Sequence, residues 1–289
     1  MIKVQGHRGY PDAYPENTLL SFRETYKTGC QGIELDVRKS SDGVFVIMHD
    51  PAVDRTTNGA GSVADLTWSY LSTLDAGGWF SSYFQGRSDC KVPRLVDVLD
   101  EFRGLDVTLV IHTAWDFVGI TDVIDLVTAR GMRAQVQIFS GIDVINPAKL
   151  YDPTIFTMNA GMPGINDYQT YLDNAVLNGH DAVSIHAGSS DEDLATMAQA
   201  IQGAGKLVHL SYLAQTYGDR INKFISLGCD YVLSNNPELM ENYVQDYYGL
   251  SPATVKLDTY RQVGGERIKT HQHTETPDGV IRLDAYTKI

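Results

Sequence analysis

Residues 107–139 read VTLVIHTAWDFVGITDVIDLVTARGMRAQVQIF. Val107–Ile111 is a short apolar, β-branched run, Val118–Ala129 carries apolar residues at helical spacing, and Ala134–Phe139 is strand-like again. A strand, a helix and a second strand in this order are typical of the unit that joins two parallel strands. The stretch therefore predicts a parallel sheet that is covered by helices.

The same alternation continues outward over most of the chain. With 289 residues and this many units, we expect an α/β fold, a closed (β/α)8 TIM-type barrel rather than an open sheet. The strand-like runs are Lys3–Gln5, Gly32–Asp36, Val44–Met48, Val107–Ile111, Ala134–Phe139, Thr154–Met158, Ala182–Ile185, Lys206–Leu210 and Tyr231–Leu233. The helix-like segments are Asn17–Lys27, Val118–Ala129, Tyr168–Leu177, Glu192–Gln202, Asp219–Ser226 and Pro237–Tyr247.

Three features do not fit a simple barrel. Nine strand-like runs compete for eight places, and the link between Asp36 and Val44 is too short for a crossover helix. Residues 67–93, rich in Gly, Ser and aromatic residues, predict a loop insertion. After Gly249 the alternation gives way to turn signals and short alternating runs. We therefore expect a barrel over 1–248, with the insertion at about 67–93, and a small β-rich C-terminal extension over 249–289.

The charge balance excludes some partners. The formal net charge is −13, from 36 acidic and 23 basic residues, so nucleic acid is not an expected partner. The chain opens without a signal-like segment, and no apolar run approaches the roughly 18 residues of a membrane span. We expect a cytoplasmic protein, or one released without a signal peptide, with no transmembrane segment. The three cysteines are widely spaced and suggest neither a disulfide framework nor a C-x-x-C metal site.

Chemically active side chains gather at the predicted ends of the first strands. His7 and Arg8 follow the first run, Glu34 and Asp36 lie in the second, and His49 ends the third. The carboxyl ends of barrel strands meet on one face, so we expect these residues to lie together. Glu34 and Asp36 are two positions apart and share one side of their strand. Two such carboxylates repel each other unless a cation or proton lies between them, and oxygen ligands suit a hard divalent cation.

Each of these residues alone also has an ordinary structural explanation. Glu34 and Asp36 could form a solvated strand face, Asn17 could cap the first helix, and Asp50 could be a turn residue. The combination of two histidines, an arginine, a glutamate and paired carboxylates at one barrel mouth favours a functional site instead.

The same residues form an ordered series of motifs. They are His7-Arg8-Gly9, Glu16-Asn17-Thr18, Glu34-Leu35-Asp36-Val37, Ser41-Asp42-Gly43, His49-Asp50, Arg55-Thr56-Thr57-Asn58-Gly59, Leu74-Asp75-Ala76-Gly77 and Val92-Pro93-Arg94-Leu95-Val96-Asp97-Val98-Leu99. This series resembles the glycerophosphodiester phosphodiesterase family, within the superfamily of barrels similar to phosphatidylinositol phospholipase C. The resemblance is specific over roughly the first 100 residues. From there to about residue 248 only the alternation of strands and helices that is typical of a barrel continues.

The resemblance implies a barrel fold and one divalent cation, commonly magnesium or calcium. By the same resemblance, His7 and His49 would be the general acid/base pair, and Glu34 and Asp36 would hold the metal. Arg8 would contact the substrate phosphate, and Glu16 would complete that phosphate site. This agrees with the residue chemistry, because imidazoles titrate near neutral pH and a cation can neutralise phosphoryl oxygens.

The chain departs from the family pattern at two strand ends. His112 stands where the family usually has a third carboxylate ligand, and Ala114 where it has a lysine. We expect His112 to be a metal ligand, which makes manganese or zinc alternatives to magnesium or calcium. The second departure is Leu233-Ser234-Asn235-Asn236-Pro237, where the family usually has Thr-Asp before a proline.

Other candidates carry less information. His186 and His209 lie at predicted strand ends and could line the barrel mouth, whereas His180 is expected at the surface. The sequence His271-Gln272-His273 could bind metal but reads more readily as a polar turn. The loop aromatics Trp79, Phe80, Tyr83 and Phe84 could cover a substrate or form a local core.

These observations lead to a first hypothesis, metal-dependent hydrolysis of a glycerophosphodiester by two-histidine acid/base catalysis. The substrate would be a small head-group diester or a polyglycerol phosphate such as teichoic acid. A second hypothesis is a catalytically silent barrel in a larger assembly, which His112 and Ala114 favour. A third, a lipase similar to sphingomyelinase D or to the phosphoinositide-specific enzymes, is disfavoured by the acidic charge and the lack of an interfacial helix. The C-terminal extension could mediate self-association.

Overall fold

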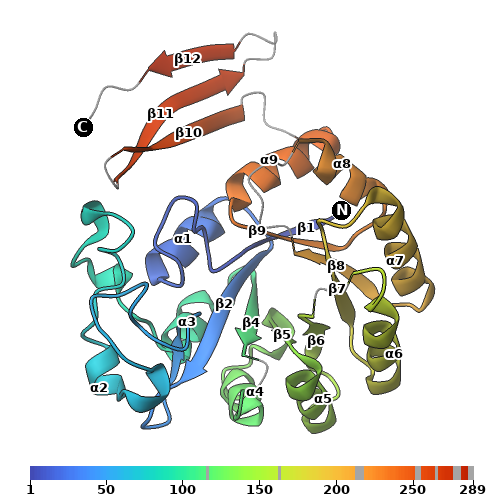
Figure 1. The fold of residues 1–289 in the computed structure, drawn as a ribbon, viewed down its shortest axis with the longest axis horizontal. Helices are drawn as coiled ribbons and strands as arrows, with labels where there is room; N and C mark the ends of the chain where they lie inside the picture. Colours follow the sequence, from blue (N-terminus) through green and yellow to red (C-terminus); the bar gives the residue numbers. More distant parts are fainter. Residues whose placement is uncertain are drawn as a thin grey trace.

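The structure is a computed structural model that describes residues 1–114, 117–161, 164–211, 218–250, 255–263, 266–275 and 281–285. Parallel strands stand in a ring at the centre of the barrel, and helices surround them (Figure 1). Their order is β1-β9-β8-β7-β6-β5-β4-β2, and β1 also pairs with β2, which closes the ring. The predicted eight-stranded TIM-type barrel is confirmed. Its strands are β1 (Lys3–Gly6), β2 (Gly32–Lys39), β4 (Thr108–Thr113), β5 (Val136–Ser140), β6 (Phe156–Asn159), β7 (Ala182–His186), β8 (Leu207–Ser211) and β9 (Tyr231–Ser234).

The surplus strand is β3 (Phe45–Ile47). It runs antiparallel to β2, with Val37 opposite Ile47, and takes no place in the ring. An antiparallel neighbour needs only a tight turn, and Gly43 supplies the left-handed residue of that turn with φ 84°. The short link between the second and third runs is therefore a hairpin, and β3 carries the chain outward to the insertion.

The outer helices follow the predicted segments closely, with two additions around the barrel besides the short α2, which lies in the insertion and was not predicted. These additions are α3 (Leu95–Phe102) and α5 (Ile142–Tyr151), which contains Pro147. The expected cap at Asn17 is wrong, because α1 begins after Thr18, whose hydroxyl accepts from the Ser21 amide. The remaining helices are α1 (Leu19–Lys27), α2 (Trp68–Leu71), α4 (Ile120–Ala129), α6 (Tyr168–Asn178), α7 (Asp191–Gly203), α8 (Gly218–Ser226) and α9 (Pro237–Tyr247), with 3-10 turns η1 (Val63–Asp65), η2 (Ser82–Phe84), η3 (Ser88–Cys90) and η4 (Arg133–Gln135). Among the described helices, none combines the length and apolar character that crossing a bilayer requires.

Apolar packing between strands and helices fixes the barrel. One cluster includes Phe22, Leu99 and Ile111, and a second includes Met197 and Phe224, all fully buried. Burial of side chains of this size contributes about 1.5–3 kcal/mol each before the entropy of ordering is subtracted. This packing holds the strands, and hence the residues at their ends, in fixed register.

The barrel interior also contains a hydrogen-bonded polar layer. Gln5 Nε2 donates to Gln137 Oε1 at 3.1 Å, and Gln137 Nε2 donates to the Tyr231 hydroxyl at 3.3 Å. His209 Nε2 lies 3.1 Å from Gln5 Oε1, and its Nδ1 lies 2.8 Å from the Ser184 hydroxyl. Buried polar groups need such partners, so this layer is structural.

The insertion between β3 and α3 packs against α1 through a small apolar cluster. Phe84 is buried with Leu20 and Cys90, and Phe80 packs against this group. Tyr83 is 74% exposed and Trp79 is 38% exposed, so the loop aromatics divide between packing and surface.

The C-terminal segment forms a three-stranded antiparallel sheet of β10 (Val255–Val263), β11 (Glu266–Glu275) and β12 (Ile281–Ala285). The expected β-rich character is thus present, while the division of the chain into domains stays a prediction. His271-Gln272-His273 lies within β11, so the expectation of a turn there is wrong.

Candidate active site

The strand order brings the candidate residues to one end of the barrel. β1, β2 and β4 are neighbours in the ring, and β9 lies on the other side of β1. In the β2–β4 register Asp36 is directly opposite His112. His7 directly follows β1, and its backbone N–H donates to the carbonyl of Ser234 at the end of β9.

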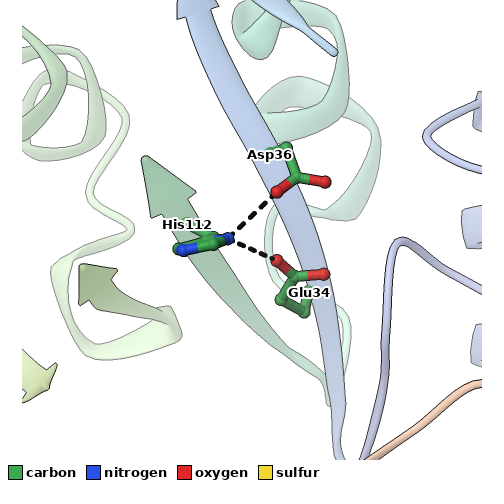
Figure 2. Close-up of side chains that lie close together, drawn as sticks. All are labelled: Glu34, Asp36 and His112. Carbon is green, nitrogen blue, oxygen red and sulfur yellow. Dashed lines mark hydrogen bonds and ion pairs between the residues drawn. The ribbon is translucent and has the colours of Figure 1, made fainter. Parts of the chain in front are cut away.

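Glu34, Asp36 and His112 form a compact group at this end (Figure 2). One ligand atom from each lies within 4.8 Å of the others. His112 Nδ1 is 3.0 Å from Asp36 Oδ1 and 3.4 Å from Glu34 Oε1. Figure 2 shows the other ring nitrogen of His112 turned away from both carboxylates.

The electrostatics of the group follow from burial and mutual attraction. Burial favours a neutral Asp36, but the His112 hydrogen bond and the charges of His112 and Arg8 outweigh it and hold the pKa of Asp36 far below its usual range. Burial would likewise lower the pKa of His112, but its bonds to Asp36 and Glu34 raise that pKa to about 10. In the absence of another cation, His112 thus carries the positive charge that the two carboxylates require.

The donor set fits a divalent cation. Glu34 Oε1 is buried and has no hydrogen-bond partner among the described residues. A buried carboxylate oxygen without a partner is costly, and a cation beside it would remove that cost. Two carboxylates and an imidazole are ordinary ligands of divalent metals. Glu34, Asp36 and His112 are therefore the residues that could hold a metal.

Arg8 and Asn17 fix the two carboxylates from the side of β1. The Arg8 backbone N–H donates to Glu34 Oε2 at 2.7 Å, and its Nε lies 3.4 Å from Asp36 Oδ2. Asn17 Nδ2 donates to Asp36 Oδ2 at 2.7 Å, and Asn17 Oδ1 accepts from the Asp36 backbone at 3.2 Å. Arg8 and Asn17 both adopt left-handed backbone, with φ 53° and 57°. Such backbone is unfavourable for non-glycine residues and recurs at functional sites.

Glu16 is a buried carboxylate between two arginines. Arg8 Nη1 donates to its Oε1 at 3.0 Å, and Arg55 donates to both of its oxygens at 2.7 and 3.0 Å. Burial alone would raise the pKa of Glu16, but the bonds and charges of Arg55 and Arg8 lower it. In this structure Glu16 orients Arg8.

His7 is held in one tautomer by an amide. Its Nδ1 lies 2.7 Å from Asn235 Oδ1, which can only accept, so Nδ1 carries the proton and Nε2 is the basic nitrogen. Desolvation lowers the pKa of His7, opposed by the charge of Glu34. His7 is therefore a neutral imidazole near neutral pH.

His49 is held by a carboxylate instead. Its Nδ1 is 2.6 Å from Asp50 Oδ1, and its backbone carbonyl accepts from Arg38 Nε at 2.8 Å. The Arg55 hydrogen bond is the main reason that the pKa of Asp50 falls to about 2, so Asp50 is ionised. The contact with Asp50 therefore fixes the orientation of the His49 ring.

A cavity of about 170 Å³ joins His49 to the carboxylate group. The residues that line it are Asp36, Val37, Arg38, Met48, His49, His112, Thr113 and Ala114. His49 also lines a small cleft together with Glu16 and Asn17. Of the predicted site residues, Asp36, His49 and His112 line the larger cavity, and Arg8 joins the group through its contacts with Glu34 and Asp36.

A family model described as the glycerophosphoryl diester phosphodiesterase family matches residues 7–239. The chain belongs to this family.

Similarity to individual family members is strongest over about a third of the chain. The chain is 42% identical over 106 residues to a glycerophosphodiester phosphodiesterase of Bacillus subtilis, and the alignment covers 35% of this chain and 36% of that protein. It is 43% identical over 97 residues to one of Caldanaerobacter subterraneus subsp. tengcongensis, covering 34% and 39%. The crystal structure of a glycerophosphodiester phosphodiesterase from Agrobacterium tumefaciens superposes with a TM-score of 0.70 at 28% identity, covering 83% of this chain and 99% of that one. The aligned segments thus span well under half of the curated relatives.

Two residues that the structure places in this candidate site had no predicted role. Asn235 orients His7, and Arg55 binds both Glu16 and Asp50. Arg55 belongs to the Arg55-Thr56-Thr57-Asn58-Gly59 motif, which was the available signal. Asn235 directly follows β9, in the segment where this chain has Ser-Asn-Asn before the proline and the family usually has Thr-Asp.

The remaining histidines lie apart from this group. His180 is fully buried, between the Thr157 hydroxyl at 2.9 Å and Asn146 Oδ1 at 2.7 Å, so its expected surface position is wrong. His209 belongs to the polar layer inside the barrel. His186, at the end of β7, is exposed.

Proposed function

We propose that this protein hydrolyses a glycerophosphodiester with the help of one divalent cation. The observation that carries the proposal is the buried Glu34 Oε1, which accepts no hydrogen bond among the described residues and has the His112 ion pair at 3.4 Å. It lies in a group with Asp36 and His112, and Arg8 donates to the other oxygen of the same carboxylate. The names of the curated relatives support the same reaction class.

Glu34, Asp36 and His112 would hold the cation. When bound, it would supply a Lewis acid that neutralises charge on the phosphoryl oxygens. Arg8 carries a permanent positive charge at the same place and is oriented by Glu16, so it would bind a second phosphoryl oxygen. These two positive charges stabilise the charge that grows as the phosphorus is attacked.

The histidine partners assign the two proton transfers. His7 faces a neutral amide and is itself neutral, so its Nε2 is suited to accept the proton of the attacking hydroxyl or water. His49 would be the second member of the acid/base pair, as the family resemblance implies: its ring is oriented by Asp50, and it would donate a proton to the leaving alkoxide. Different environments for two similar groups are a general way to separate acid and base roles.

The substrate we propose is a head-group diester of glycerol phosphate, or a polyglycerol phosphate such as teichoic acid. By family the cation would be magnesium or calcium, whereas the imidazole of His112 favours manganese or zinc. To test the function, chelator-stripped protein is given Mg²⁺, Ca²⁺, Mn²⁺ or Zn²⁺ singly with glycerophosphocholine or purified polyglycerol phosphate. Release of phosphomonoester or glycerol phosphate by wild type, and its loss in His7→Gln and Glu34→Gln, is the expected result.

One observation favours a second candidate, a catalytically silent barrel. His112 contacts both carboxylates and, when protonated, replaces one positive charge without any metal. If the barrel is silent, the wild-type protein would bind none of the four cations and would release no product from either substrate. The His112→Glu variant would behave in the same way. Cation binding together with turnover would exclude it.

A further inference from the structure

We propose that Arg55 is a positioning residue that fixes Arg8 and His49 relative to each other. The proposal rests on the function proposed above. Arg55 lies in the loop after β3, outside the strands that carry the carboxylates. Its guanidinium connects the carboxylate that orients Arg8 with the carboxylate that orients His49.

The contacts form one continuous chain across the site. Arg55 Nη1 and Nη2 donate to Glu16 Oε2 and Oε1 at 3.0 and 2.7 Å. Its Nε and Nη2 donate to Asp50 Oδ2 and Oδ1 at 2.5 and 3.0 Å. Glu16 Oε1 also accepts from Arg8, and Asp50 Oδ1 lies against His49 Nδ1. Only a planar guanidinium can hold two carboxylates in this paired way.

The backbone that carries Arg55 is itself fixed. The Thr57 hydroxyl donates to the carbonyl of Val53 at 2.7 Å and accepts from the amide of Gly59 at 3.0 Å. The Asn58 amide donates to the carbonyl of Asp75 at 3.1 Å, and Asn58 Oδ1 accepts from the Asp75 amide at 2.8 Å. The guanidinium also lies 5.9 Å from the centre of the Trp79 ring, within the range of a cation–π contact. A loop tied down in this way can hold a side chain in one position.

The consequence concerns geometry rather than charge. Glu16 keeps Arg8 as a partner when Arg55 is removed, and Asp50 keeps His49, so both carboxylates remain partly compensated. What is lost is the shared contact through which Arg55 fixes the position of the Arg8 guanidinium relative to the His49 ring. Misplacement of reacting groups by about 1 Å can cost on the order of a hundredfold in rate.

The test is Arg55→Ala, assayed with the cation and substrate that support wild-type turnover. We expect kcat to fall by roughly a hundredfold while KM changes by less than about threefold. The Arg55 side chain is 42% exposed, so solvent can reach the space it leaves. Guanidinium chloride at low, non-denaturing concentration should therefore restore at least about a tenth of the lost kcat. Methylammonium and sodium chloride at equal ionic strength should not.

Arg94→Ala is the matched control. Arg94 is 41% exposed, binds Asp97 through Nε and Nη2, and lies 5.4 Å from the Trp68 ring, so it has the same kinds of contact away from the site. We expect its kcat to stay within about twofold of wild type and to be insensitive to guanidinium.

Two outcomes overturn the proposal while leaving the proposed function intact. One is wild-type kcat in Arg55→Ala. The other is a loss of kcat that guanidinium does not restore in a variant whose unfolding midpoint equals that of Arg94→Ala. If Arg55→Ala fails to fold, Arg55→Lys is measured instead. A lysine keeps the charge but cannot pair with both carboxylates, so it should lose most of the same kcat, and full activity would overturn the proposal. Absence of wild-type turnover with every cation would overturn both the function and this role.

Discussion

His112 Nδ1 lies 3.0 Å from Asp36 Oδ1, directly across the β2–β4 register. The same nitrogen is 3.4 Å from Glu34 Oε1, so one imidazole serves two buried carboxylates. The ring of His112 packs against Phe139, with centroids 5.1 Å apart, which limits its rotation. A nitrogen donor is thus built into a group whose other donors are oxygens.

This relationship predicts the metal preference of the site. We expect chelator-stripped wild type to bind Mn²⁺ and Zn²⁺ at least roughly tenfold more tightly than Mg²⁺ or Ca²⁺. In His112→Glu the ratio should shrink by roughly tenfold, because the nitrogen donor is replaced by an oxygen donor. Calorimetric titration measures both ratios, and His186→Gln, which alters an exposed histidine, is the control. Equal ratios in wild type and His112→Glu would remove His112 from the ligand set.

The His7–Asn235 contact predicts a change in pH dependence. In Asn235→Asp a carboxylate replaces the neutral amide at 2.7 Å from His7 Nδ1 and stabilises the imidazolium, so the pKa of His7 rises. His7 must be neutral to act as a base, so the acid limb of the kcat/KM profile should move to higher pH. A profile of Asn235→Asp that coincides with wild type would contradict the assignment of His7 as the base.

Much of the fold and of the site was predictable, because both depend on periodic patterns. The alternation of strands and helices is local, and the convergence of strand ends follows from a parallel barrel. His7, Arg8, Glu34 and Asp36 could be placed together on that ground, whereas His112 was assigned to the group through the family resemblance.

The remaining features depend on contacts between distant segments or on local conformation. The role of β3 follows from the pairing of β2, which is parallel to β4 and antiparallel to β3. No pattern within Phe45–Ile47 itself indicates this pairing. Asn17 looks like a cap by residue type, but its left-handed backbone turns the side chain to Asp36. Pro147 within α5 hid that helix from a pattern-based prediction. His180 looked exposed because Asn146 and Thr157, which satisfy it, are far away in sequence.

The two buried histidines outside the site predict acid sensitivity of the fold. Burial lowers the pKa of His180 to about 4 and the pKa of His209 to about 3. Both values lie below the ordinary value of about 6.5, so the unfolded chain takes up protons first as the pH falls. Stability is therefore lost from about pH 6.5 downward, and each histidine should cost about 2 kcal/mol of unfolding free energy between pH 7 and pH 5.

Urea unfolding at the two pH values measures this loss. In His209→Gln the difference between the unfolding free energies at pH 7 and pH 5 should be smaller than in wild type by about 2 kcal/mol, the contribution of one histidine. This holds whatever the substitution does to the unfolding free energy at a single pH. His186→Gln, which alters an exposed histidine, is the control variant. A difference in His209→Gln equal to that of wild type would show that His209 is protonated equally in the folded and unfolded states.

The most direct test of the central claim is a phosphorus NMR time course. Chelator-stripped wild type, with one added divalent cation, is mixed with glycerophosphocholine, and the diester and monoester resonances are followed. We predict that the diester resonance is replaced by a phosphomonoester resonance, and that neither His7→Gln nor His49→Gln produces this change. A diester resonance that persists with Mg²⁺, Ca²⁺, Mn²⁺ and Zn²⁺ in turn, in folded protein and also with polyglycerol phosphate, would contradict the account.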